Sequence, residues 1–145
     1  MVTALPGLRR LVSDTMVGVQ RINVTSGGPF ENVFGYSRAV RVGDHIHVSG
    51  TTARDPHLDD ADAYEQAMAA LAIVEKALIE AGSSLAAVVR TVSYVTDIGD
   101  RDLVARAHVE KFGDIRPAAT LVQVSGLVDK RMKVEIEAYA IEPAG

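Results

Sequence analysis

The sequence contains no cysteine and no tryptophan, and aromatic residues make up only 5% of its 145 residues. The absence of cysteine excludes a disulfide framework, a thiolate metal site and a cysteine nucleophile. The scarcity of aromatic residues argues against a stacking platform for single-stranded nucleic acid. A chain of this length still removes roughly 70% of its unfolded surface from water, so we expect one domain with its own core.

The charge balance and the apolar runs restrict the partners of the protein. The acidic residues outnumber Lys and Arg by 19 to 15, and no basic stripe suited to a phosphate backbone stands out. No segment reaches the roughly 20 consecutive apolar residues that cross a membrane, because Glu75, Lys76 and Glu80 interrupt the longest apolar region. Arg9 and Arg10 are not followed by the apolar segment of an export signal. We therefore expect a cytoplasmic protein that binds neither nucleic acid nor membranes.

The first half of the chain predicts a β-hairpin. Residues 36–42 and 45–50 are rich in alternating or β-branched residues, and the turn pair Gly43-Asp44 separates them. Residues 21–24 either add a further strand or are mobile. No linker or repeat divides the chain, so residues 1–145 are expected to form a single domain.

The second half predicts alternating helices and strands. Apolar residues at spacings of three and four predict a helix over 63–81, ended by a glycine. A β-branched strand over 88–95 and a shorter helix over 100–112 follow. Two strands are expected at 119–124 and 133–141. This order favours a two-layer α+β domain, with a mixed sheet and two helices packed on one of its faces.

The last expected strand carries the best candidates for chemistry. Its residues alternate strictly, which places Glu135 and Glu137 on one face. Paired carboxylates raise each other's pKa, and one of them could activate a water molecule as a general base. Alternatively, the face is simply solvated, an interpretation that we prefer for Glu137.

The other polar residues are weaker candidates on their own. His45 and His47 lie two apart on a strand, but no third ligand for a catalytic zinc ion is evident, so we expect no metal. No serine stands in the Gly-x-Ser-x-Gly motif of a nucleophilic hydrolase. Arg38, Arg106 and Arg116 would each be ordinary surface charges in isolation.

Five short motifs in a fixed order change this interpretation. The motifs are Gly35-Tyr36-Ser37-Arg38-Ala39-Val40, Val48-Ser49-Gly50, the segment 89–97, Arg116-Pro117-Ala118 and Val134-Glu135-Ile136-Glu137-Ala138. Together they resemble the Rid superfamily, also called the YjgF/YER057c/UK114 or reactive-intermediate deaminase family. The resemblance covers residues 35–141 and leaves residues 1–32 as an N-terminal extension. It implies a chorismate-mutase-like fold and a homotrimer whose sheets form a central barrel, with a small-molecule cleft between each pair of subunits.

The resemblance also implies an activity. Family members with deaminase activity hydrolyse imines and enamines derived from amino acids to a keto acid and ammonia, without metal or cofactor. It implies catalytic roles for Glu135 and Tyr36, and a substrate pocket that includes Ser49 and Gly50. A water molecule positioned by the carboxylate would attack the C=N carbon, a step that needs orientation and proton transfer.

The sequence departs from the family at one motif. Deaminating members carry an arginine in a Pro-Ala-Arg motif, where its planar guanidinium clamps the substrate carboxylate. This chain has Ala119 at that position, followed by Thr120 and Leu121, which the resemblance places among the substrate-binding residues. Loss of one positive charge about 4 Å from a carboxylate removes roughly 4 kcal/mol of attraction at an effective dielectric near 20. We therefore expect an altered substrate specificity.

Three arginines could replace the missing charge. Arg106 aligns where many members carry asparagine at the cleft, Arg38 follows Tyr36 by two positions on the expected strand, and Arg116 precedes the altered motif. Two classes of function follow: a deaminase with altered specificity, or a non-catalytic trimer that binds or senses a small metabolite. A translation-inhibiting ribonuclease activity is attributed to some relatives, but the acidic net charge gives it little support here.

Overall fold

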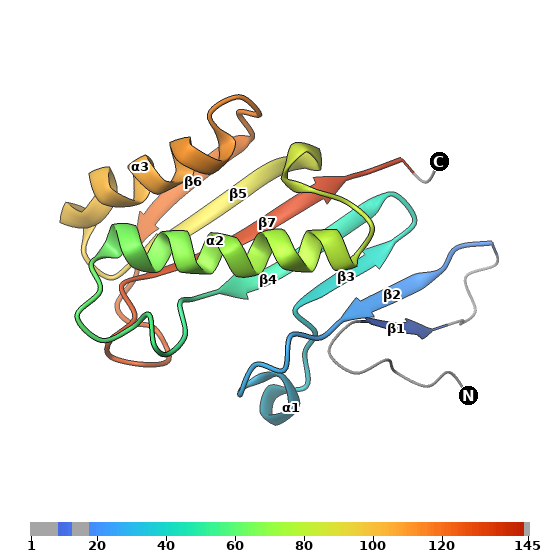
Figure 1. Cartoon of the computed structure of the whole chain (residues 1–145), viewed down its shortest axis with the longest axis horizontal. Coiled ribbons are helices and arrows are strands. Elements are labelled where there is room, and N and C mark those ends of the chain that lie inside the picture. The colour runs from blue at the N-terminus through green and yellow to red at the C-terminus, as the bar shows by residue number, and fades with distance from the viewer. Residues whose placement is uncertain (1–8, 13–17, 144–145) are drawn as a thin grey trace.

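The computed structural model describes residues 9–12 and 18–143, which form one mixed sheet and three α-helices (Figure 1). Two single-turn 3-10 helices, η1 (Leu85–Ala87) and η2 (Ile98–Asp100), precede β5 and α3. The α-helices are α1 (Glu31–Phe34), α2 (Ala63–Glu80) and α3 (Arg101–Phe112). The strands are β1 (Arg9–Val12), β2 (Arg21–Val24), β3 (Ala39–Val42), β4 (His45–Thr51), β5 (Val88–Val95), β6 (Ala118–Gln123) and β7 (Val134–Ile141).

The order of the strands in the sheet is β1-β2-β3-β4-β7-β5-β6. Strand β7, the last in the chain, lies between β4 and β5 and runs antiparallel to both. Strands β5 and β6 are parallel, and α3 lies in the connection between them. A parallel pair needs such a crossover connection, whereas the antiparallel pairs at the other end of the sheet do not.

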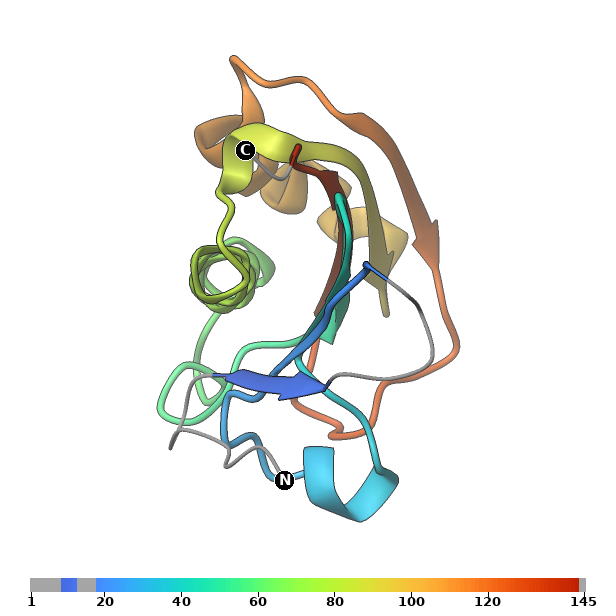
Figure 2. The same cartoon turned by 90° about the vertical axis from the view of Figure 1, so that its right-hand side faces the viewer.

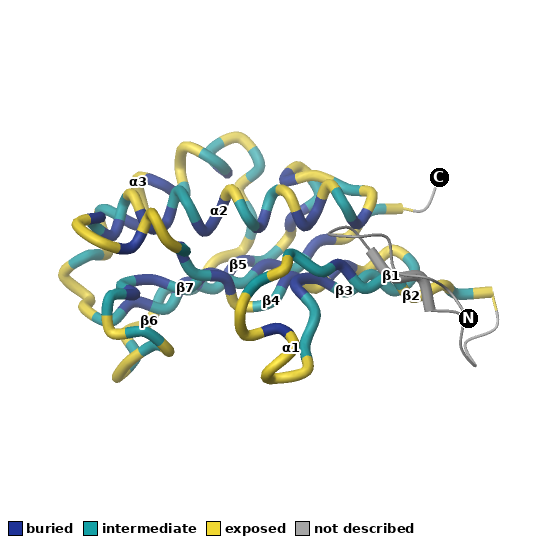
Figure 3. The backbone as a smooth tube through the Cα atoms, turned by 60° about the horizontal axis from the view of Figure 1, so that its bottom comes forward, coloured by how far each residue is buried: buried dark blue, intermediate teal, exposed yellow. Residues whose placement is uncertain are grey.

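Helices α2 and α3 cover one face of the sheet (Figure 2). The core lies between the two layers, and its largest fully buried side chains include Phe112 of α3, Leu71 and Leu78 of α2, and Ile46 and Ile136 of the sheet. The tube in Figure 3 shows the buried residues concentrated between these layers, while α1 is mostly exposed. The expected two-layer α+β fold, with a mixed sheet and two helices on one face, is confirmed.

Helix α2 is held by capping interactions at both ends. The Asp62 side chain accepts a hydrogen bond from the Glu65 backbone N–H at 2.8 Å, and the Glu65 side chain accepts one from the Asp62 N–H at 3.1 Å. At the other end, Gly82 has φ of +83°, and the Ser83 N–H donates to the Leu78 carbonyl at 2.8 Å. The predicted helix over 63–81, ended by Gly82, is therefore confirmed to within one residue.

The predicted hairpin is present, but its first strand is shorter than expected. Strands β3 and β4 are antiparallel with Val42 opposite His45, and Gly43 supplies a positive φ of 59° at the first turn position. Strand β3 begins only at Ala39, because the Arg38 N–H already donates to the Val24 carbonyl at 2.7 Å outside the ladder. The expectation that Tyr36 and Arg38 lie two positions apart on one strand, and so on one face of it, is therefore wrong.

The segment before the resemblance contributes to the sheet. Residues Arg21–Val24 form β2, which pairs with β3, and Val24 is completely buried. Of the two alternatives for this segment, the strand is the one observed. Residues 1–8 and 13–17 of the expected extension lie outside the described residues. No helix in the described ranges is both long and apolar enough to cross a membrane.

Candidate functional site

A cleft of about 820 Å³ opens at the end of the sheet where β4 finishes and β7 begins. Its walls are the segment around α1, the loop after β4 and the loop before β7. The residues predicted for the site that line it are Tyr36, Arg38, Ser49, Gly50 and Glu135. These side chains come from three separate parts of the sequence, so tertiary folding is what brings them together.

An extra residue in β4 shapes the floor of the cleft. Val48 lies opposite Ala138, but Thr51 lies opposite Ile136, so two residues of β4 face one residue of β7. Ser49 instead donates its N–H to the Arg38 carbonyl at 2.9 Å. Such a β-bulge bends the strand and redirects its side chains, and bulges of this kind occur near active sites.

Gly50, inside this bulge, lies directly against the Glu135 carboxyl group. A Cβ atom at position 50 would lie 2.9 Å from Glu135 Cδ and 3.0 Å from each carboxylate oxygen. These distances are shorter than ordinary contacts to a methyl group, so a larger residue would displace the carboxylate. Glycine at this position therefore gives Glu135 its place in the cleft.

The environment of Glu135 favours proton exchange. Burial raises the pKa of its carboxyl group, the positive charge of Arg38 opposes that effect, and the negative charge of Glu137 adds to the increase. The pKa of Glu135 consequently lies above its ordinary value. A carboxyl group with a raised pKa can both accept and return a proton closer to neutral pH.

Arg38 is a buried cation with few partners. Its exposed fraction is 3%, and its Nη2 donates to the Gly50 carbonyl at 3.0 Å. Its guanidinium carbon lies 5.2 Å from the centre of the Tyr36 ring. Its Nε is buried without a hydrogen-bond partner among residues 9–12 and 18–143. Burying a charge is costly unless it is compensated, so this guanidinium favours an anion in the cleft.

Tyr36 is placed by the segment that forms α1. Its backbone N–H donates to the Glu31 carbonyl at 3.0 Å, and its ring packs edge-on against Phe34 with centroids 6.2 Å apart. Val33 and Phe34 also line the cleft and are 83% and 84% exposed. The rim of the cleft beside Tyr36 is thus apolar.

Two further residues of the cleft region, Glu31 and Arg54, were not predicted from the sequence. Glu31 is buried and accepts hydrogen bonds from the Thr25 hydroxyl at 3.0 Å and from the Ser26 hydroxyl and backbone N–H. Burial raises the pKa of Glu31, but these bonds outweigh that effect and hold it below its ordinary value. Arg54 Nη2 lies 3.8 Å from Glu31 and 2.7 Å from the Ser26 hydroxyl. No local pattern marks either residue, because Glu31 precedes the recognised motifs and Arg54 lies in an irregular loop.

Arg131, on the outer wall of the cleft, is already saturated with carboxylates. Its guanidinium lies 2.9 Å from Asp55, 3.0 Å from Asp59 and 2.8 Å from Asp129. Hydrogen bonds from Arg131 lower the pKa of Asp129 to about 2. This cluster ties the loop after β4 to the loop before β7 and neutralises the charge of Arg131.

Two of the arginines predicted for the site lie elsewhere in this chain. Arg106 is exposed on α3, with its guanidinium carbon 3.8 Å from the centre of the Tyr64 ring. Arg116 is exposed before β6, where its backbone has a φ of +56°. Neither lines the cleft, and their roles in substrate binding stay predictions.

The altered motif lies on β6, at the opposite edge of the sheet from β1. Ala119 is exposed, and Leu121 is partly buried against the core. The Thr120 hydroxyl accepts a hydrogen bond from Arg90 Nη2 at 2.7 Å. Within one chain these three residues do not line the cleft that contains Glu135 and Tyr36, so their role at the site also stays a prediction.

The histidines of β4 are engaged with an aromatic ring. His45 and His47 stack on Tyr139, with centroids 5.7 and 4.7 Å away, and His45 also makes a hydrogen bond to the Tyr139 hydroxyl. Glu137 accepts a hydrogen bond from the Tyr94 hydroxyl. Where the structure describes the chain, no group of three or more His, Cys, Asp or Glu side chains is placed so that it could hold a metal ion.

Comparison with known proteins identifies the family. Residues 29–142 match the family model described as Endoribonuclease L-PSP. The chain is 42% identical over 120 residues to the uncharacterized protein SCO2049 of Streptomyces coelicolor, covering 80% of this chain and 90% of that protein. It is 34% identical over 110 residues to the 2-iminobutanoate/2-iminopropanoate deaminase of Homo sapiens, covering 74% of this chain and 80% of that enzyme.

The comparison of folds supports the same family. The crystal structure of Rv2704 from Mycobacterium tuberculosis, described as a member of the YjgF/YER057c/UK114 family, matches with a TM-score of 0.78 and 45% identity. The match covers 83% of this chain and 98% of that chain. Sequence and fold together show that the chain belongs to the Rid (YjgF/YER057c/UK114) family, some of whose members are named imine deaminases.

Proposed function

We propose that this protein is a cofactor-independent deaminase that hydrolyses an imine or enamine metabolite, with Glu135 and Tyr36 acting on the substrate. The observation that carries the proposal is the half-buried Glu135 carboxyl group, which lies against Gly50 in a cleft that also contains Arg38. Its raised pKa suits a group that takes up and returns a proton during one reaction.

The chemistry needs one water molecule and no redox step. Glu135 accepts a proton from the water as the water oxygen bonds to the C=N carbon and the π electrons pass to nitrogen. The protonated Glu135 gives this proton to the nitrogen, which leaves a carbinolamine with one hydroxyl and one amino group. Glu135 then takes the hydroxyl proton and passes it to the amino nitrogen as the C=O bond forms and the C–N bond breaks, so a keto acid and ammonia leave. An enamine enters the same route after protonation at carbon, and Tyr36, which lines the same cleft, orients the substrate.

The name of the human relative supports an imino acid as the substrate class. Such a substrate carries a carboxylate, which repels an ionised Glu135 unless a cation compensates. Ala119 supplies no charge, whereas Arg38 lines the same cleft as Glu135. We therefore infer a specificity that differs from that of relatives with the motif arginine.

A homotrimer is part of this proposal. The residues that the resemblance assigns to the pocket fall into two groups, one at the cleft and one on β6 at the edge of the sheet. Thr120 and Ala119 can approach Glu135 only if a second copy of the chain places its β6 beside the cleft. Clefts between subunits of a cytoplasmic trimer would satisfy this requirement.

A non-catalytic trimer that binds or senses a small metabolite is the second candidate. The observation that favours it is Ala119, which removes the guanidinium that clamps the substrate in deaminating members. Such a protein would keep the cleft and bind a keto acid or imino acid without turnover.

Ammonia release separates the two candidates. An amino-acid oxidase would generate 2-iminopropanoate in the assay, and a lyase would generate 2-aminoacrylate. The rate of ammonia release with the protein would be compared with the rate of spontaneous hydrolysis. We expect turnover by the wild type and a loss of roughly 100-fold or more in Glu135→Gln. Glu137→Gln, two positions along the same strand face and outside the cleft, is the matched control and should retain most of the activity.

Absence of ammonia release by the wild type would contradict the proposal. Activity that then appears in Ala119→Arg would indicate a competent pocket adapted to another ligand and would favour the binding function. Equal turnover by the wild type and Glu135→Gln would remove Glu135 from the reaction.

A further inference from the structure

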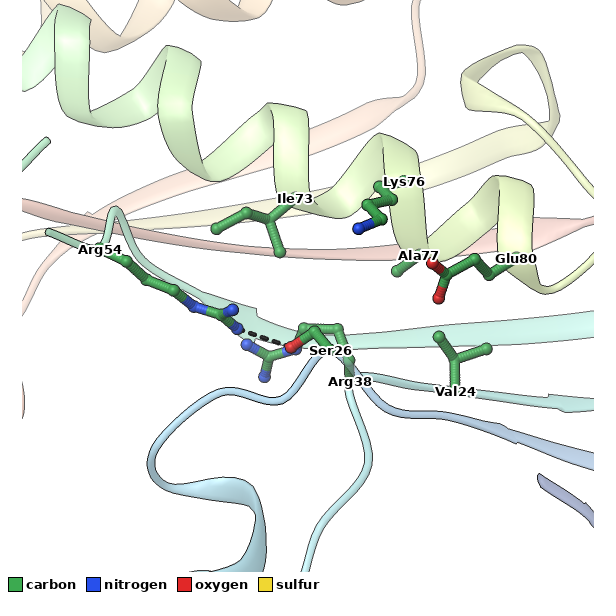
Figure 4. Close-up of a pocket in the computed structure, with 8 residues that line it drawn as sticks. All are labelled: Val24, Ser26, Arg38, Arg54, Ile73, Lys76, Ala77 and Glu80. Atoms are coloured by element: carbon green, nitrogen blue, oxygen red, sulfur yellow. Dashed lines mark hydrogen bonds between the residues drawn. The ribbon is translucent and has the colours of Figure 1, made fainter. Parts of the chain in front are cut away.

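Two arginines are shared between the cleft and a second, smaller cavity. This cavity, of about 100 Å³, lies between α2 and the sheet next to β2. Arg38 and Arg54 line both the cavity and the cleft, so these two side chains border both spaces. Figure 4 shows both groups extending to one region beside the Ser26 hydroxyl.

The guanidinium groups of this pair make few hydrogen bonds within the described part of the chain. Among the described residues, that of Arg38 donates one hydrogen bond, to the Gly50 carbonyl at 3.0 Å, and that of Arg54 donates one, to the Ser26 hydroxyl at 2.7 Å. Burial lowers the pKa of Arg54, and the positive charge of Arg38 lowers it further. Both effects disfavour the charged form, so an anion bound between the two groups would relieve a repulsion that the folded chain contains.

Glu31 compensates this pair only in part. Its carboxylate lies 3.8 Å from Arg54 Nη2, too far for a hydrogen bond, and its oxygens are already occupied by donors of the segment 25–28. Gly28 allows this close arrangement, since a Cβ there would lie 2.7 Å from Arg54 Nη2. Glu31 therefore positions the segment and Arg54, while most N–H groups of Arg54 remain available.

Arg131 provides an internal contrast. It lines the same cleft, but three carboxylates surround it within 3.0 Å. An anion that enters the cleft would meet a neutralised cluster at Arg131 and two under-compensated guanidinium groups at Arg38 and Arg54. The charge distribution thus selects one end of the cleft for the anionic part of a ligand.

We propose that Arg38 and Arg54 form a two-guanidinium carboxylate site, and that Arg54 is the specificity-determining residue that replaces the motif arginine missing at Ala119. For the identity of the carboxylate as that of an imino acid, this inference rests on the proposed function. The anion site itself does not require turnover. Planar guanidinium groups bind a carboxylate through paired charged hydrogen bonds, which a neutral amide cannot reproduce.

Calorimetric titration of the full-length chain with pyruvate, the keto acid that hydrolysis of 2-iminopropanoate yields, tests the site without catalysis. Its uncharged amide, pyruvamide, is the matched ligand without the negative charge. We expect pyruvate to bind roughly ten- to a hundred-fold more weakly to Arg54→Gln than to the wild type, with pyruvamide affected little. Arg54→Lys should recover part of the affinity, because it restores the charge but not the planar fork.

The matched control is Arg101→Gln, which makes the same change of net charge at an exposed side chain of α3 outside both cavities. It should bind pyruvate as the wild type does. Thermal unfolding of each variant would establish that Arg54→Gln is folded at the temperature of the titration. If Arg54→Gln is unfolded there, folded Arg54→Lys carries the test, and pyruvate affinity equal to the wild type in that variant overturns the proposal.

The remaining outcomes separate this inference from the proposed function. Equal pyruvate affinity in the wild type and Arg54→Gln, or no binding of pyruvate to the wild type, would overturn the site. Arg54-dependent binding of inorganic phosphate without any binding of pyruvate would also overturn it, in favour of a site for free oxyanions. Arg54-dependent pyruvate binding by a wild type that releases no ammonia would support the site and contradict the deaminase. Turnover by the wild type with an unchanged KM in Arg54→Gln would support the deaminase and contradict the site.

Discussion

Strand β7 presents two different faces. Val134, Ile136 and Ala138 face the helices and are buried, while Glu135 and Glu137 on the other face are half-buried. The apolar face continues into α2 and α3 as one core in which side chains of both layers are packed. The charged face leads into a cleft that holds the buried Arg38 guanidinium, whose Nε has no hydrogen-bond partner within the described part of the chain.

The two regions differ in what their residues contribute. Burial of apolar side chains stabilises the fold in proportion to the surface removed from water. Buried charges with incomplete partners cost stability, and proteins retain such groups at functional sites. Substitutions in the core should therefore change stability, and substitutions in the cleft should change binding or activity.

Among the substitutions that test this division, Leu71→Ala should have the largest effect. Leu71 is completely buried in α2, so the substitution leaves a cavity and should lower the free energy of unfolding by about 3–4 kcal/mol. Urea unfolding at constant protein concentration measures it. The folded fraction should keep the turnover of the wild type, and a change in KM would contradict the separation of core and cleft.

Gly50→Ala tests the cleft side of the comparison. The added methyl group would lie 2.9 Å from Glu135 Cδ and should displace the carboxylate, with a loss of roughly 100-fold in kcat/KM. Steady-state ammonia release measures the loss. Because Gly50 is exposed, we expect little change in the midpoint of unfolding. An active Gly50→Ala would show that the position of Glu135 is not critical.

Glu31→Gln tests a buried carboxylate that lies beside the cleft and outside the apolar core. The neutral amide cannot accept all the hydrogen bonds from Thr25, Ser26 and Gly28, so we expect a loss of about 1–3 kcal/mol at pH 7. The folded pKa of Glu31 is lowered, so its contribution is present above its ordinary value of 4.5 and disappears as the pH falls through the folded pKa. The difference in unfolding free energy between wild type and variant should therefore shrink in acid. A difference that stays constant down to pH 2 would contradict this.

The smallest expected effect is a shift in the pH profile of kcat. Glu135 acts as a base above its pKa, so activity should fall as the pH drops through that raised value. Arg38 holds the pKa of Glu135 down, so Arg38→Gln should move this acid limb to higher pH. Arg101→Gln should leave it in place. A limb that moves to lower pH would contradict the electrostatic effect of Arg38 on the pKa of Glu135.

Several elements follow from local patterns in the sequence. The spacing of apolar residues and the terminal Gly82 predicted α2, and strict alternation predicted the two faces of β7. The hairpin followed from Gly43-Asp44, because a glycine at the first turn position takes the positive φ that the turn requires. The position of β7 between β4 and β5 has no such local signal, since it depends on pairing between distant segments.

The candidate site was only partly predictable. Glu135 and Tyr36 stand in recognisable sequence motifs. Glu31 and Arg54 are 23 positions apart and follow no periodic pattern, so their contact could not be predicted from the sequence. The true start of β3 was also missed, because the Arg38 backbone bonds to Val24 rather than to the strand ladder.

The sequence by itself determined the family, the two-layer α+β class and the alternation that separates core from charge on β7. These features depend on residue spacing along one segment, where backbone geometry fixes which side chains share a face. Only the tertiary structure decided that Gly50 lies against Glu135 and that Arg38 and Arg54 border the same cavities. A bulge and two irregular loops produce these contacts, and their geometry depends on packing against the rest of the fold rather than on neighbouring residues.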